Sequence, residues 1–187
     1  NSSKLVIYHE GHYGDFLTHG ENTIRFFLDR GYSVLAFSMP MLGSNNQPSI
    51  YLERFGKLKF IHHDQLGLLE SDDFSPIKLF VEPVAVGINY IGGDYKEIDM
   101  VGISGGGWTT TLYSAIDPRI SKSYPVASSM PLYLRSDVRK DWGDYEQYLP
   151  ELYRVANYLE LYILGSYGEN RRQLQILNKY DSCCFSG

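Results

Sequence analysis

A serine set between glycines stands where an apolar strand signal changes into a helix signal, in the run VGISGGGW from Val101 to Trp108. The G-x-S-x-G spacing predicts a tight strand–turn–helix connection. A serine held at so sharp a turn is strained, and side chains two residues to either side would clash. Gly102 and Gly106 meet that need. A Walker A loop would need a lysine after the glycines, and a dinucleotide-binding loop would need glycine in place of Ser104. The glycines therefore do not indicate either kind of phosphate binding.

Strand and helix signals alternate along the chain, which predicts an α/β protein with a mostly parallel sheet and helices on both faces. The expected strands span residues 4–9, 32–37, 97–103, 121–127 and 159–164. The expected helices are one from Thr18 to Gly31, one over residues 77–91 ended by Gly92 and Gly93, and three over residues 105–116, 145–157 and 171–179. Thr18 and Glu21 have the spacing of a capping box. We expect residues 39–73, which are polar and aromatic, to form an excursion outside the core.

Composition narrows the class of protein. A length of 187 residues fits a single domain, residues 1–187, and the 43% hydrophobic and 21% charged residues are ordinary for a soluble globular chain. The net charge of −5 argues against a nucleic-acid partner. No apolar run reaches the roughly 18–20 residues of a membrane span, and no signal peptide or compartment is indicated. The adjacent Cys183 and Cys184 cannot form a CxxC zinc site; they are a candidate redox pair, although buried packing is the simpler interpretation.

These features together resemble the α/β-hydrolase superfamily over nearly the whole chain. Residues 5–12 resemble its oxyanion strand and loop, residues 31–36 its next strand, and residues 102–106 its nucleophile elbow. The resemblance implies hydrolysis of an ester, or amide, bond in a small molecule through an acyl-enzyme at Ser104, with no cofactor. It also implies an oxyanion hole built from two backbone N–H groups, those of Gly105 and His12.

The resemblance also implies a carboxylate after a later strand and a histidine after the last strand. Glu169, in the turn after the expected strand 159–164, is the first candidate for the acid, and Asp181, beyond the expected helix 171–179, is the second. Weaker candidates for the acid are Asp137, Asp141 and Asp144. No histidine follows His63, and the two strands that usually precede the oxyanion strand are missing, so we expect a hydrolase core truncated at both ends. The alternative is a non-catalytic hydrolase-fold module that binds a ligand or a partner.

The histidines offer a second kind of chemistry. We expect His9 and His12 to shape the oxyanion loop. Both are expected in the loop that faces the elbow, so the alternative is that one of them approaches Ser104. A metal site could be assembled from imidazole and carboxylate groups, namely those of His9, His12, His62, His63 and Asp64. These residues lack the HExxH spacing of a helical zinc site. We therefore expect no metal, and expect His63 and Asp64 to make local turn hydrogen bonds or to line a substrate cleft.

Overall fold

The computed structural model describes residues 2–91, 95–137, 139 and 141–185. Within them one sheet has five strands in the order β2-β1-β5-β6-β7, and every neighbouring pair is parallel. Its strands are β1 (Lys4–His9), β2 (Ser33–Phe37), β5 (Glu97–Ile103), β6 (Lys122–Val126) and β7 (Arg172–Gln173). The predicted α/β class is confirmed, and four of the five predicted strands are present within one residue of their predicted bounds.

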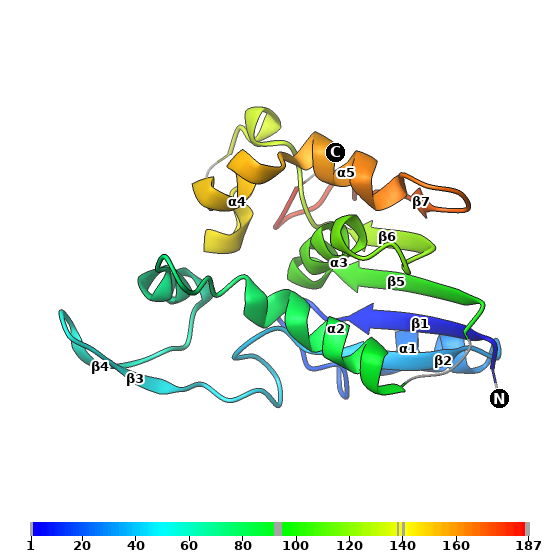
Figure 1. The fold of residues 1–187 in the computed structure, drawn as a ribbon, viewed down its shortest axis with the longest axis horizontal. Coiled ribbons are helices and arrows are strands. Elements are labelled where there is room, and N and C mark those ends of the chain that lie inside the picture. The colour runs from blue at the N-terminus through cyan, green and yellow to red at the C-terminus, as the bar shows by residue number, and fades with distance from the viewer. Residues whose placement is uncertain (1, 92–94, 138, 140, 186–187) are drawn as a thin grey trace.

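Helices cover both faces of the sheet, as predicted. Figure 1 shows α2 (Lys78–Ile91) and α3 (Gly105–Ile116) in front of the strands. Leu5 and Ile7 of β1 point to this side and pack in one core cluster with Val84 of α2. Successive side chains of a strand alternate between faces, so Tyr8 points to the other side, where its ring lies against Gly20 at the start of α1 (Glu21–Leu28). Because both faces of β1 are buried, its central residues 5–8 form a continuous apolar run rather than an alternating one.

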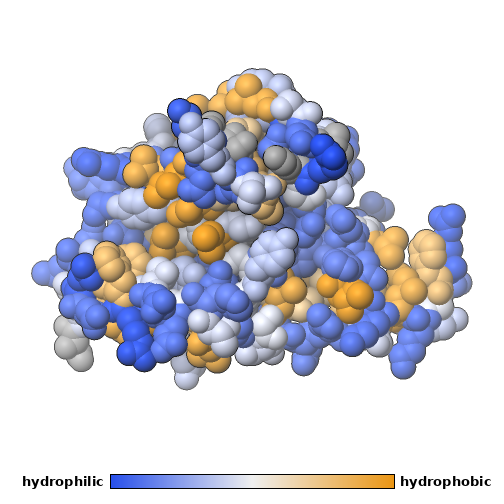
Figure 2. Space-filling view, turned by 180° about the vertical axis from the view of Figure 1, so that it is seen from behind, coloured by the Kyte–Doolittle hydropathy of each residue, from blue (hydrophilic) through white to orange (hydrophobic). Residues whose placement is uncertain are grey.

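The excursion after β2 stands outside the sheet, but the expectation that it lies outside the core is wrong. It contains an antiparallel hairpin, β3 (Ser49–Leu52) and β4 (Gly56–Lys59), and a 3₁₀ helix, His63–Leu69. Its Phe60 and Leu66 are buried in a second core cluster with Trp108 of α3. The hairpin itself projects from the body (Figure 1), and from behind it shows apolar side chains on its surface (Figure 2). No helix among the described residues is long and apolar enough to cross a membrane.

The predicted strand at 159–164 is wrong, because these residues belong to the helix α5 (Tyr158–Ser166). Asn157 caps the helix: its side chain accepts hydrogen bonds from the N–H groups of Leu159 and Glu160. The Glu160 carboxylate in turn accepts from the Asn157 N–H at 2.8 Å. This reciprocal capping box, N-x-x-E, was present in the sequence. A short apolar run fits a buried strand and a buried helix equally well, so the cap was the better guide.

The predicted helix at 171–179 is also wrong, because this segment supplies the last strand of the sheet. β7 pairs with β6, and Ile176 makes a further parallel bridge with Val126. The guanidinium of Arg171 donates to the Leu164 carbonyl at the end of α5 and thereby turns the chain back toward the sheet. This pairing is between segments far apart in sequence, so local patterns did not reveal it.

Two smaller expectations also fail. Residues 145–157 form a 3₁₀ turn, Tyr145–Gln147, and a separate helix α4 (Pro150–Val155), which begins at Pro150, a position where the helix needs no backbone N–H. Thr18 does not cap α1: its hydroxyl donates to the Asp15 carbonyl, and Gly20 is the N-cap residue. Gly92 and Gly93, expected to end α2, lie outside the described residues.

We predict that Asp99→Asn changes how stability depends on pH. Asp99 of β5 is buried and accepts the Lys122 N–H at 3.1 Å; burial raises the pKa of its carboxyl to about 6, from an ordinary 3.8. The folded state therefore holds the proton longer than the unfolded chain, and wild-type stability falls as pH rises from about 4 to 6. Asparagine keeps the acceptor oxygen without the charge. The variant should gain on the order of 1–2 kcal/mol relative to wild type between pH 4 and pH 7.

Urea unfolding at several pH values measures this difference in the free energy of unfolding. The exposed Asp72→Asn is the matched control and should show no such gain. A difference between Asp99→Asn and wild type that stays constant across this pH range would contradict the prediction.

Candidate functional site

Ser104 occupies the turn between β5 and α3, so its predicted strand–turn–helix placement is confirmed. Its backbone has φ 54° and ψ −124°, a conformation that costs a residue with a side chain on the order of 1–3 kcal/mol. The Ser104 N–H donates to the Val126 carbonyl of β6 at 2.8 Å, and the Ser104 carbonyl accepts the Trp108 N–H at 3.0 Å. The serine is thus tied to the sheet on one side and to the helix on the other, with its side chain half-buried.

Three glycines allow the backbone to close around this serine. A Cβ at Gly102 would overlap the Gly106 carbonyl, and a Cβ at Gly106 would overlap the carbonyl oxygens of His9 and Glu10. Neither position therefore has room for a side chain, as predicted. A Cβ at Gly11 would come within 2.9 Å of the Ser104 Cβ. The loop after β1 consequently lies directly against the serine.

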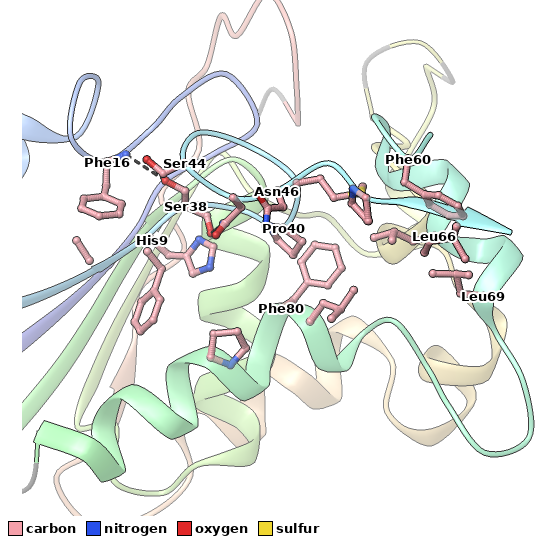
Figure 3. Close-up of a pocket in the computed structure, with 18 of the residues that line it drawn as sticks. His9, Phe16, Ser38, Pro40, Ser44, Asn46, Phe60, Leu66, Leu69 and Phe80 are labelled. Atoms are coloured by element: carbon pink, nitrogen blue, oxygen red, sulfur yellow. Dashed lines mark hydrogen bonds between the residues drawn. The ribbon is translucent and has the colours of Figure 1, made fainter. Parts of the chain in front are cut away.

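Ser104 opens into a cavity of about 340 Å³. Its lining includes Gly105, His12, His63, Asp144, Cys184 and Phe185. A larger, more apolar cavity of about 590 Å³ lies beside the excursion, with His9 at one end and Phe60 at the other (Figure 3). Ser104 does not line the larger cavity. We therefore take the smaller cavity as the candidate site, since it holds the strained serine and the start of α3.

Two histidines and two carboxylates meet on one side of this cavity. His12 Nε2 lies 2.9 Å from His63 Nδ1, 2.9 Å from Asp144 Oδ2 and 3.5 Å from Glu146 Oε1. Asp144 was predicted only as a weak candidate for the triad acid, and Glu146 was not singled out. The sequence signal that could have found them is the pair D-x-E in a segment between regular elements. His63 lines the cavity, which is one of the two positions predicted for it. The Asp64 carboxylate instead accepts a hydrogen bond from the Tyr148 hydroxyl at 3.2 Å.

The imidazoles and carboxylates of this cluster shift one another's pKa values. Burial lowers the pKa of His12, but Asp144 and Glu146 outweigh burial and raise it to about 9. Burial raises the pKa of Glu146, but the imidazoles of His12 and His63 lower it to about 2. His9 lies outside the cluster: its Nδ1 bonds the Glu10 carbonyl, and burial lowers its pKa to about 4. Five residues were considered from the sequence as possible metal ligands. The structure brings two of them, His12 and His63, together, and it places His9 elsewhere.

The two candidates for the triad acid lie at opposite ends of the strands. Glu169 is exposed and precedes β7, and the next residue, Asn170, shares a surface hollow with Lys4 at the amino end of β1. Asp181 follows β7 and is half-buried, and its carboxylate accepts the Cys183 N–H at 2.8 Å. The argument that favoured Glu169 required a strand at 159–164 and is overturned by α5.

The remaining candidates are held in local contacts. Asp137 and Asp141 share a turn, where the Asp137 N–H donates to the Asp141 carboxylate at 3.2 Å. Cys183 and Cys184 are joined by a disulfide and line the cavity, so they are not a buried apolar pair as the simpler interpretation expected.

The parallel sheet with helices on both faces and the strained serine turn between β5 and α3 together define the α/β-hydrolase fold. The chain is similar to acetyl xylan esterase from Paenibacillus sp. R4, with 18% identity and a TM-score of 0.64 over 94% of this chain and 59% of that one. It is also similar to an esterase from Pyrococcus furiosus, with 17% identity and a TM-score of 0.56 over 95% and 62%. A protein assigned as a dienelactone hydrolase from Klebsiella pneumoniae has 15% identity and a TM-score of 0.55 over 96% and 62%.

This chain therefore spans about three fifths of the length of these proteins. At such identities the likeness shows the fold alone. Comparisons with protein-family models and with curated proteins found no match.

We predict that Gly106→Ala disrupts the elbow. The added methyl group would meet two backbone carbonyls that cannot move aside without shifting β1 from α3. Overpacking of this kind costs about 1–3 kcal/mol or more. Denaturant unfolding should show that loss, whereas Gly67→Ala, whose Cβ would lie 3.6 Å from the nearest atom, should lose far less. Equal stability of the two variants would contradict the packing described here.

Proposed function

We propose that the protein is a serine hydrolase that cleaves an ester, or amide, bond of a small molecule through an acyl-enzyme at Ser104. The observation that carries the proposal is the strained backbone of Ser104 at the carboxyl edge of the sheet, with the glycines that this strain requires. Strain of this kind at a half-exposed serine beside a cavity is expected where the hydroxyl must be presented to a substrate. Similarity in fold to two esterases supports the same reaction class.

The proposed oxyanion hole uses backbone N–H groups. Gly105 is the first residue of α3, so its N–H is not used within the helix and lies at the positive end of the helix dipole. His12 would supply the second N–H from the loop packed on Ser104. When the serine oxygen adds to the substrate carbonyl, these two groups would stabilise the negative charge on the tetrahedral intermediate. Collapse of that intermediate releases the alcohol or amine, and water then frees the acid.

The proton of Ser104 needs a general base. His12 is a poor base near neutral pH, because its raised pKa keeps it protonated. His9 is buried, and its Nδ1 is engaged with the Glu10 carbonyl. We propose instead that the base is a histidine outside this sequence, as the family resemblance implies.

We further propose Asp181, rather than Glu169, as the carboxylate that orients this base. Asp181 follows β7 at the edge of the sheet where Ser104 emerges, and Cys183, two residues on, lines the Ser104 cavity. Glu169 precedes β7, and strands of five to seven residues separate the two edges by roughly 15–20 Å. That separation is too great for one imidazole to bridge a carboxylate at one edge and Ser104 at the other.

We predict that a fluorophosphonate probe labels Ser104 in the full-length protein. Ser104→Ala should abolish labelling, because the probe forms its bond with an activated serine oxygen. Ser166→Ala, which removes a hydroxyl engaged with the helix carbonyl of Tyr162, is the control and should label normally. Peptide mass spectrometry identifies the labelled residue. Failure to label wild type would favour the alternative, a non-catalytic hydrolase-fold module.

We predict that Asp181→Asn lowers kcat of the full-length protein for a p-nitrophenyl ester by about 10⁴-fold, as expected when the triad acid no longer fixes the histidine tautomer. The amide oxygen can still accept the N–H groups of Cys183 and Cys184, so the local fold should survive. Glu169→Gln should leave kcat within about twofold of wild type. A large loss in Glu169→Gln and none in Asp181→Asn would contradict the assignment.

A further inference from the structure

We propose that His12, His63, Asp144 and Glu146 bind a divalent transition-metal ion, with Zn²⁺ the best fit. The four ligand atoms would be His12 Nε2, His63 Nδ1, Asp144 Oδ2 and Glu146 Oε1, and all lie within 4.8 Å of one another. The inference concerns a site beside the Ser104 cavity and does not rest on the chemistry proposed for Ser104.

The buried carboxylate of Glu146 is the strongest reason to place a cation here. Its side chain is fully buried, and neither of its oxygens has a hydrogen-bond donor among the described residues. Its nearest nitrogens are His12 Nε2 at 3.5 Å and His63 Nδ1 at 3.8 Å, which are charge contacts rather than aligned hydrogen bonds. A buried carboxylate without donors is costly unless a cation balances it.

The tautomer of His63 points the same way. Its Nε2 lies 2.8 Å from the Pro40 carbonyl, which can only accept, so this nitrogen carries the proton. In the neutral ring, Nδ1 then presents a lone pair to the centre of the cluster. A ligating histidine whose other nitrogen donates to a backbone carbonyl is the usual arrangement around a bound metal.

The N–H groups that face the centre of the cluster are too few to give every acceptor there a hydrogen bond. Whether or not its ring is protonated, His12 Nε2 carries at most one hydrogen, which it can direct either to His63 Nδ1 or to Asp144 Oδ2, each 2.9 Å away. Glu146 receives none. A divalent cation would meet all four atoms at once, and its two charges would balance the two carboxylates.

The distances suit a tetrahedral ion. Ligand bonds of 2.0–2.1 Å at tetrahedral angles place neighbouring ligand atoms roughly 3.3–3.4 Å apart. Five of the six separations here are 2.9, 2.9, 3.5, 3.7 and 3.8 Å. Two imidazoles with two carboxylates favour zinc over magnesium or calcium, which prefer oxygen ligands.

Four protein ligands leave no position for a reactive water, so the ion would have a structural role. It would join three separate segments: the loop after β1 through His12, the 3₁₀ helix of the excursion through His63, and the segment after β6 through Asp144 and Glu146. Because His12 follows Gly11, which packs on Ser104, the ion would also fix the loop beside the serine.

The test measures metal bound by the full-length protein, produced without a histidine tag. After incubation with Zn²⁺ and dialysis, mass-spectrometric metal analysis should find one zinc per chain. The Co²⁺ form should show the intense visible absorption of tetrahedral coordination. Glu146→Gln and His63→Ala should each weaken zinc affinity by at least about tenfold, the loss that even an outer partner of a ligand causes. Circular dichroism checks that both variants fold.

Two variants serve as controls. His62→Ala removes the exposed imidazole next to His63 and should bind zinc as wild type does. Ser104→Ala should also bind normally, which separates this site from the proposed reaction. The proposal is overturned if wild type binds no zinc, leaving the cluster as ion pairs around a protonated His12. It is equally overturned if folded Glu146→Gln and His63→Ala bind zinc as tightly as His62→Ala.

Discussion

The contact between the loop after β1 and the first turn of α3 fixes the geometry of the rest of the site. Two backbones meet there with no side chain between them: Gly106 lies on the carbonyls of His9 and Glu10, and Gly11 lies on Ser104. Only glycine permits such an approach. The contact sets how closely α3 sits on the sheet, and it brings the oxyanion loop, the helix N-terminus and the serine to one point.

The polar groups around that point come from segments that the sheet alone does not arrange. Ser104 and His12 follow parallel strands, and the carboxyl ends of such strands share one edge of a sheet. His63 and Glu146 instead belong to 3₁₀ turns, whose positions depend on the buried packing of Phe60, Leu66 and Tyr145 in one core cluster. The apolar core of the excursion therefore determines where the charged groups of the site stand.

Sequence patterns predicted the centre of the fold and failed toward its carboxyl end. β1, β5 and α3 follow from strong apolar runs and from glycine spacing, which are local signals. The exchange of helix and strand over residues 159–179 has two causes: an overlooked cap at Asn157, and a short strand held mainly by partners on β6. That error alone moved the expected acid to Glu169. The D-x-E spacing could have marked Glu146 as a candidate, but not its burial, which depends on tertiary contacts.

The strand order has a consequence for synthesis of the chain. β1 is made before β2 and β5 but lies in the interior of the sheet, between them. Its pairing with β2 can form early, whereas its other edge has to wait for β5, which begins at Glu97. Until then an apolar strand has unpaired backbone groups, the condition that favours pairing with other chains. Folding on the ribosome would therefore depend on how long this edge stays shielded before β5 emerges.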